Sequence, residues 1–166
     1  MQASPGLRKH GATSSSGSVN GYRYNARVLA QHIAEKHFGI RRERPTLDGD
    51  EVVPFLLGEL ARAPELWTQK GYLARVVDLD EADGFRDAGI VPLADFVDRE
   101  GDACAVAVEY DADGTIIPVV YVRRGGHLLE HALPPHPLHM FDTEEHRQQL
   151  ATSLAPLRPT TVSARS

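Results

Sequence analysis

The stretch that decides the fold lies at residues 103–122. It reads ACAVAVEY at 103–110, DADG at 111–114 and TIIPVVYV at 115–122. Two β-branched runs joined by a short loop that contains Asp-Gly are typical of a β-hairpin. Both runs are apolar on both faces for most of their length, which predicts that both faces are covered, by helices on at least one side. Pro118 has no backbone N–H, so its nitrogen should face away from the hydrogen-bond ladder or lie at an edge.

The residues before the hairpin predict two helices, the first at 22–38. Its apolar stripe consists of Val28, Leu29, His32, Ile33 and Lys36. A second helix should begin after a cap at Asp48 or Asp50 and end at Arg62, with Pro54 in its first turn, where a missing N–H costs little. One further turn at 65–70 would place Leu66 and Trp67 against the core.

From Tyr72 onward the pattern alternates, and residues 72–79 predict a strand. Residues 81–89 are polar and predict a loop or a short helix, whereas residues 90–97 fit either a strand or a helical turn. Pro92 would confine such a strand to an edge of the sheet. A final helix should run from Asp142 or Thr143 to about residue 155.

This order of elements predicts an α+β fold, with a small antiparallel sheet centred on the hairpin at about 103–122, two N-terminal helices and one C-terminal helix. Residues 22–155 should form a single domain. Residues 1–21, rich in Gly and Ser, predict a disordered arm, and residues 156–166 predict a flexible tail.

Length and composition exclude several classes of protein. The 166 residues are 42% hydrophobic and 25% charged, which is typical of one globular domain rather than a disordered chain. No apolar run reaches the roughly 18–20 residues that span a bilayer, and no secretory signal is evident. Because Cys104 is the single cysteine, an internal disulfide is impossible. We therefore expect a soluble, cytoplasmic protein.

The net charge of −5 hides an uneven distribution. Residues 1–45 carry +6 and residues 46–116 carry −12. The acidic middle argues against nucleic-acid binding there, since phosphate contacts need clustered Lys and Arg. We expect a non-catalytic protein-binding module whose acidic surface, at about 78–113, recognises a partner protein, possibly a basic one. Its contact residues would be Asp80, Asp83, Asp98 and Asp102.

The alternative function is metal binding at residues 127–139, which read HLLEHALPPHPLH. The candidate ligands are His127, Glu130, His131, His136 and His139, with zinc as the metal. The first five residues resemble the H-x-x-E-H pattern of the inverted zinc metallopeptidases. However, Pro134 and Pro135 stop any helix there, and no glutamate follows at the separation that this family needs. The peptidase function is therefore rejected, and a plainer zinc site remains as an alternative.

No other sequence pattern indicates catalysis or a cofactor. Cys104 lies in an apolar strand, where a thiol is usually inert and its pKa raised. The basic residues 36–44 follow the first helix, whose dipole they stabilise. We interpret His32 as a hydrogen-bonded histidine at the edge of the core.

Residues 89–109 carry one resemblance to a known family. Gly89-Ile-Val-Pro-Leu-Ala-Asp95, then an acidic segment at 98–102 and the strand at 103–109, resemble the central part of SMI1/KNR4-type domains. This resemblance implies an α+β protein, and the family includes many bacterial toxin-immunity proteins. The glycine run that usually precedes the central strand is missing here.

Overall fold

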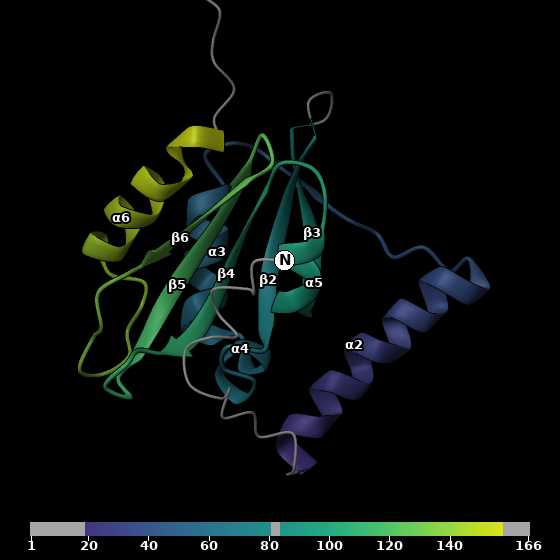
Figure 1. The fold of residues 1–166 in the computed structure, drawn as a ribbon, viewed down its shortest axis with the longest axis horizontal. Helices are drawn as coiled ribbons and strands as arrows, with labels where there is room; N and C mark the ends of the chain where they lie inside the picture. The colour runs from purple at the N-terminus through teal and green to yellow at the C-terminus, as the bar shows by residue number, and fades with distance from the viewer. Residues whose placement is uncertain (1–18, 81–83, 158–166) are drawn as a thin grey trace, which may run out of the picture.

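The computed structural model describes residues 19–80 and 84–157, and it has the predicted α+β architecture (Figure 1). The predictions for Asp83 and for residues 1–18 and 158–166 lie outside this range. Among the described helices, none combines the length and apolar composition that a bilayer crossing requires.

The centre of the fold is a six-stranded antiparallel sheet of order β1-β3-β2-β4-β5-β6. The strands are β1 (Thr46–Leu47), β2 (Leu73–Asp80), β3 (Gly84–Pro92), β4 (Ala103–Tyr110), β5 (Ile116–Arg124) and β6 (His127–Ala132). The predicted hairpin is formed by β4 and β5, which pair from Ala103–Arg123 to Tyr110–Ile116. The prediction that a sheet centres on residues 103–122 is confirmed.

Asp111 fixes the turn of this hairpin. Its Oδ1 accepts hydrogen bonds from the Asp113 N–H at 2.9 Å and the Thr115 N–H at 2.8 Å. Pro118 pairs with Val108 inside the sheet, and its carbonyl accepts a hydrogen bond from the N–H of Leu133, just beyond β6. Both backbone groups of a strand residue point to the same side, so the nitrogen of Pro118 faces away from β4, as predicted.

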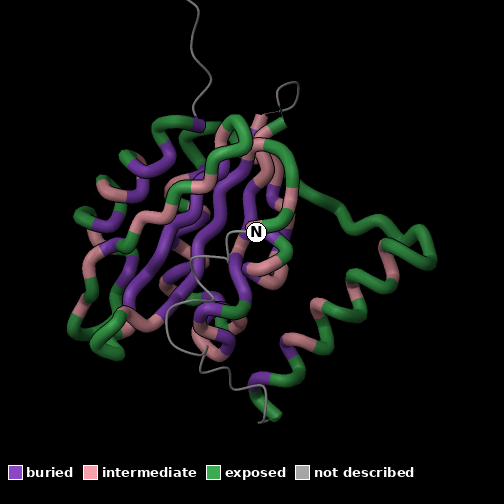
Figure 2. Tube along the Cα trace, in the orientation of Figure 1, coloured by how far each residue is buried: buried purple, intermediate pink, exposed green. Residues whose placement is uncertain are grey.

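Helices cover both faces of the sheet, as the apolar hairpin predicts. On one face lie α3 (Val52–Arg62), α4 (Pro64–Thr68), α6 (Glu144–Leu154) and the short 3-10 helix η2 (Ala155–Leu157). On the other face α5 (Leu93–Asp98) inserts Leu93 and Phe96. The strands of the hairpin are buried almost throughout (Figure 2).

Local predictions for the helices are confirmed in part. Thr143 caps α6, because its Oγ1 accepts a hydrogen bond from the N–H of His146. Neither Asp48 nor Asp50 caps α3, which follows Glu51 without a side-chain cap. The carboxylate of Glu51 instead accepts a hydrogen bond from the N–H of Asp48. The further turn predicted at 65–70 is α4, and Pro54 lies in the first turn of α3, as expected.

The prediction of a loop or short helix at 81–89 is wrong for its second half, because β3 begins at Gly84. The strand continues to Pro92, and α5 follows at once, so residues 90–97 contain both predicted alternatives. The strand β1 pairs with β3 only at Phe85 and Arg86. At Pro92, β3 is therefore the edge strand of the sheet, as predicted.

The first helix, α2 (Val19–Phe38), begins three residues earlier than predicted and stands beside the body of the protein (Figure 1). Its predicted stripe does not enter the core. Leu29 is 58% exposed, and only Gly21 and Tyr24 of this helix are buried. The interpretation of His32 as a core-edge residue is also wrong, because it is exposed. The physical reason is that the two faces of the sheet are already occupied by other helices.

Candidate functional site

The predicted metal ligands of the 127–131 segment lie on a strand, β6, and not on a helix. Successive side chains of a strand point to opposite faces, so Glu130 faces away from His127 and His131. These two histidines share a face but lie about 13 Å apart along the strand, given its rise of about 3.3 Å per residue. The strand therefore separates the three ligands that a helix would have brought together.

The remaining histidines of this region have local partners. The Nδ1 of His136 accepts hydrogen bonds from the N–H groups of Leu138 and Met140, at 3.3 and 3.2 Å. The ring of His139 lies 5.6 Å from that of Trp67. His146 is buried, with Nδ1 2.6 Å from Thr143 Oγ1 and Nε2 2.9 Å from the carbonyl oxygen of Pro134. Within residues 19–80 and 84–157 no three His, Cys, Asp or Glu side chains converge to hold a metal ion.

Arginines form ion pairs with two carboxylates of the predicted acidic surface. Asp78 Oδ1 lies 3.4 Å from Arg99 Nη1, and Asp102 Oδ2 lies 2.5 Å from Arg124 Nη1. The other carboxylate oxygen of Asp102 accepts a hydrogen bond from the N–H of Gly125.

The segments that carry the predicted contact residues Asp80, Asp98 and Asp102 are neighbours in the fold: the N–H of Leu79 donates to the carbonyl of Asp102, and Arg99 forms an ion pair with Asp78. Asp80 is exposed at the end of β2, and Asp98 is exposed at the end of α5. Asp95, also on α5, and Glu100, just after it, are exposed as well. The acidic surface is therefore concentrated on α5 and the turn that follows it.

A groove of about 700 Å³ separates α2 from β3 and α5. One wall is formed by α2, with Tyr22, Val28 and Leu29. The opposite side is formed by Tyr72 and by residues 88–92 of β3. Most of the groove is therefore apolar, and its volume lies in the range of pockets that hold ligands.

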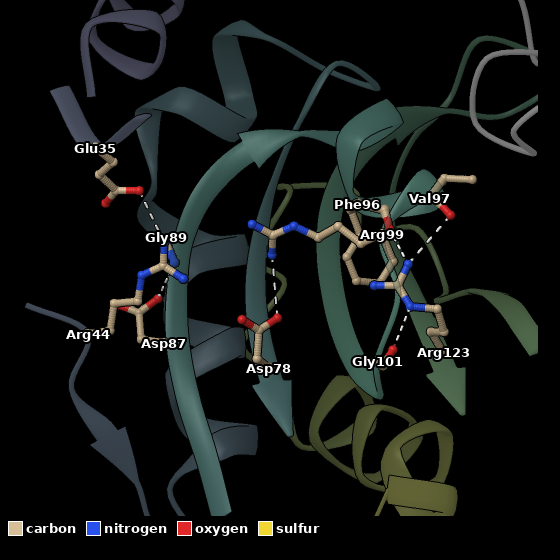
Figure 3. A network of polar contacts seen from close by, with 10 residues as sticks. All are labelled: Glu35, Arg44, Asp78, Asp87, Gly89, Phe96, Val97, Arg99, Gly101 and Arg123. Atoms are coloured by element: carbon tan, nitrogen blue, oxygen red, sulfur yellow. Dashed lines mark hydrogen bonds and ion pairs between the residues drawn. The ribbon is translucent and has the colours of Figure 1, made fainter. Parts of the chain in front are cut away.

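Charged side chains mark the two ends of this groove. At one end Arg44 forms an ion pair with Glu35 at 3.2 Å (Figure 3). Arg42 donates a hydrogen bond to the side chain of Gln31. At the other end Asp95 and Arg99 belong to the lining. The groove thus has an apolar centre and a polar rim.

The groove stays open because α2 makes few contacts with the body. An ion pair joins Arg27 to Glu65 of α4 at 3.6 Å, and Tyr24 is buried near the start of the helix. After α2 the chain runs from residue 39 to 45 without regular structure before it joins the sheet at β1. The helix is therefore held by Tyr24 and Arg27 in its first half and by the chain that follows it.

A second hollow of about 420 Å³ contains a small network of charged residues. Arg75 forms two ion pairs, from Nη1 to Glu59 Oε2 at 3.4 Å and from Nη2 to Asp87 Oδ2 at 2.6 Å. Its guanidinium packs over the ring of Phe55. Burial raises the pKa of Glu59, and the nearby Arg75 opposes this effect. Asp87 also accepts a hydrogen bond from the N–H of Gly89, so the network supports the middle of β3.

Replacing Glu59 with Gln should change how stability depends on pH. Because the pKa of Glu59 is raised in the folded protein, its protonated form contributes to the free energy of unfolding at low pH, and this contribution is lost as pH rises. Gln cannot ionise, so the advantage of the native chain over Glu59→Gln should shrink as pH rises above the ordinary pKa of a glutamate, about 4.3. Urea unfolding of both proteins at several pH values measures this difference, with Glu145→Gln as the exposed control. An advantage that grows with pH would contradict this account.

Two buried groups could suggest catalysis, but their surroundings suppress reactivity. Burial raises the pKa of the Cys104 thiol to about 12, in the direction predicted for a thiol in an apolar strand. Burial also raises the pKa of Tyr121, whose hydroxyl donates a hydrogen bond to Glu109. Neither group belongs to the lining of the two hollows described above.

Comparison with known proteins identifies no relative. No family model, no curated protein and no solved structure matches this chain. The likeness of residues 89–109 to SMI1/KNR4-type domains therefore stays a prediction.

Sequence reasoning missed the groove because its parts come from separate segments. Residues 22–35, 42–44, 72–73 and 88–99 all contribute to its lining. The available signal was the stripe of α2, which was assigned to the core. An apolar stripe interrupted by His32 and Lys36 is compatible with an exposed face as well.

Proposed function

We propose that this chain is a non-catalytic protein-binding module and that the groove between α2 and β3 is its docking site. The observation that supports this proposal is the exposure of large apolar side chains along α2, beside an apolar groove. Contiguous exposed apolar surface with a polar rim is typical of sites of protein–protein interaction.

Within the described part of the chain, large exposed apolar side chains are concentrated on α2 and the residues that follow it. They are Val19, Tyr22, Leu29, Ile33, Phe38 and Ile40, of which Tyr22 and Leu29 line the groove. Tyr72, across the groove, is also exposed. Burying such side chains against a partner would release about 25 cal/mol per Å² of apolar surface.

The exposed carboxylates on α5 lie next to one end of the groove, where Asp95 belongs to the lining. A partner that carries apolar side chains and a basic residue at this end would match both features. The acidic surface expected from the sequence thus becomes a part of the proposed site, and a basic partner remains the preferred one.

Peptides selected from a phage-displayed random library against the full chain can test this proposal. Replacing Leu29 with Glu should raise the Kd of the selected peptides about tenfold or more, because a charge would enter the apolar wall. Fluorescence anisotropy with labelled peptide measures the affinity. Leu29 is already exposed, so the variant should fold.

Leu129→Glu is the matched control. Leu129 is 45% exposed on β6 and does not line the groove, so this variant should bind as the native chain does. Equal affinity for native chain and Leu29→Glu would contradict the proposed site. If those peptides were basic and lost affinity only with Asp98→Asn, the acidic surface alone would be the docking site.

A further inference from the structure

The outer edge of β3 is only partly paired. β1 pairs with β3 at Phe85 and Arg86, and the N–H of Asp87 donates to the carbonyl of Pro45 at 2.9 Å. Beyond this point the chain leaves the sheet toward α2. Among the described strands, none pairs with residues 88–92 on the side that faces the groove.

Both ends of this open edge are defined. At one end the guanidinium of Arg42 lies over Gly89, where an added Cβ would come within 3.2 Å of Arg42 Nη1. At the other end Pro92 has no N–H to offer, and α5 begins at Leu93. The N–H of Gly89 already donates to the Asp87 carboxylate, so the open edge is short, and the flanking Ala88, Ile90 and Val91 belong to the lining of the groove.

Natural proteins often cover such an edge with a helix, and α2 lies at the place where a cover would be. However, α2 leaves about 700 Å³ between itself and β3. The space therefore separates the helix from the backbone groups that it would have to shield.

An open edge selects its ligand by backbone chemistry. It presents N–H and C=O groups in alternation, and an extended backbone satisfies both kinds of group at a spacing of about 4.8 Å. A helix cannot do so, since its own N–H and C=O groups are already paired.

We propose that the groove takes a short extended segment of a partner protein, which joins the sheet as a strand beside residues 88–91 of β3, in line with β1. This inference rests on the proposed function and specifies its binding mode. The added strand would lie between β3 and α2, with Tyr22, Val28 and Leu29 of α2 along its outer side. A basic residue of the segment would lie near Asp95.

Alternate N-methylation of a library-selected peptide tests this binding mode. Successive N–H groups of a strand point to opposite sides, so one set of alternate residues faces β3 and the other faces away. Methylating the set that faces β3 should raise the Kd at least tenfold. Methylating the other set should change it less than threefold, which makes each peptide the control for the other.

The outcomes separate this inference from the proposed function. Equal affinity of both methylated peptides, or equal loss in both, would overturn strand addition, since only one set of N–H groups can meet β3. If the same peptides still lost affinity with Leu29→Glu, the groove would remain the docking site. Insensitivity to Leu29→Glu would overturn the proposed function itself.

Discussion

Replacing Phe141 with Ala is expected to lower the free energy of unfolding by about 3–5 kcal/mol. Phe141 is fully buried in the loop between β6 and α6. Its ring stacks on Trp67 with centroids 5.4 Å apart and lies 5.6 Å from the ring of His146. Truncation would leave a cavity between α4 and α6 that neither element can fill. Urea unfolding followed by fluorescence measures the loss.

The neighbouring Met140 provides the control for this prediction. Its side chain is exposed, so Met140→Ala should change the free energy of unfolding by less than about 0.5 kcal/mol. A loss of under about 1 kcal/mol for Phe141→Ala would contradict the packing described between α4, α6 and the loop.

Replacing Arg123 with Ala is expected to cost about 2–4 kcal/mol of stability, because it would leave buried carbonyls without donors. The guanidinium of Arg123 is buried over the ring of Phe96, at 4.6 Å. Its Nε donates to the carbonyl of Gly101 at 2.7 Å, and its Nη1 donates to that of Phe96 (Figure 3). Arg123 thus joins β5 to the end of α5 and to the turn before β4.

Arg124 is the matched control, one residue further along β5. Its ion pair with Asp102 is partly exposed, so Arg124→Ala should cost less than about 1 kcal/mol. Similar losses for the two variants would contradict the bridging role of Arg123. The same urea unfolding experiment compares them.

Local turn chemistry explains why the hairpin could be predicted from sequence. Asp111 to Gly114 specify a tight turn, and the flanking runs of small and β-branched residues are typical of strands. The cap of α6 is equally local, because Thr143 lies three residues before His146. These features depend on neighbours in the chain, so a pattern can show them.

The strand at 84–92 could not be predicted because its stability is not local. Its sequence, GFRDAGIVP, contains glycines and a proline that disfavour strands in isolation. It forms because β2 pairs with it along its length, across a register shift between Val76 and Val77. The polar Asp87 is accommodated there by Arg75.

The candidate sites show the same limit. Spacing alone could not distinguish a helix from a strand in HLLEHA, and the choice of strand separates His127 from His131. The exposure of α2 depends on which faces of the sheet other helices occupy. Within residues 19–38 the polar His32 and Lys36 in the stripe are compatible with exposure but do not decide it.

Nuclear magnetic resonance of the 15N-labelled chain, titrated with a library-selected peptide, tests the docking site most directly. We predict that the largest chemical-shift changes occur at residues 88–92 of β3 and around Leu29 of α2. The strand β6 should be unaffected. Chemical-shift changes confined to β6 would contradict the proposed groove. Changes confined to the exposed carboxylates of α5 and the turn after it, with none at residues 88–92, would also contradict it.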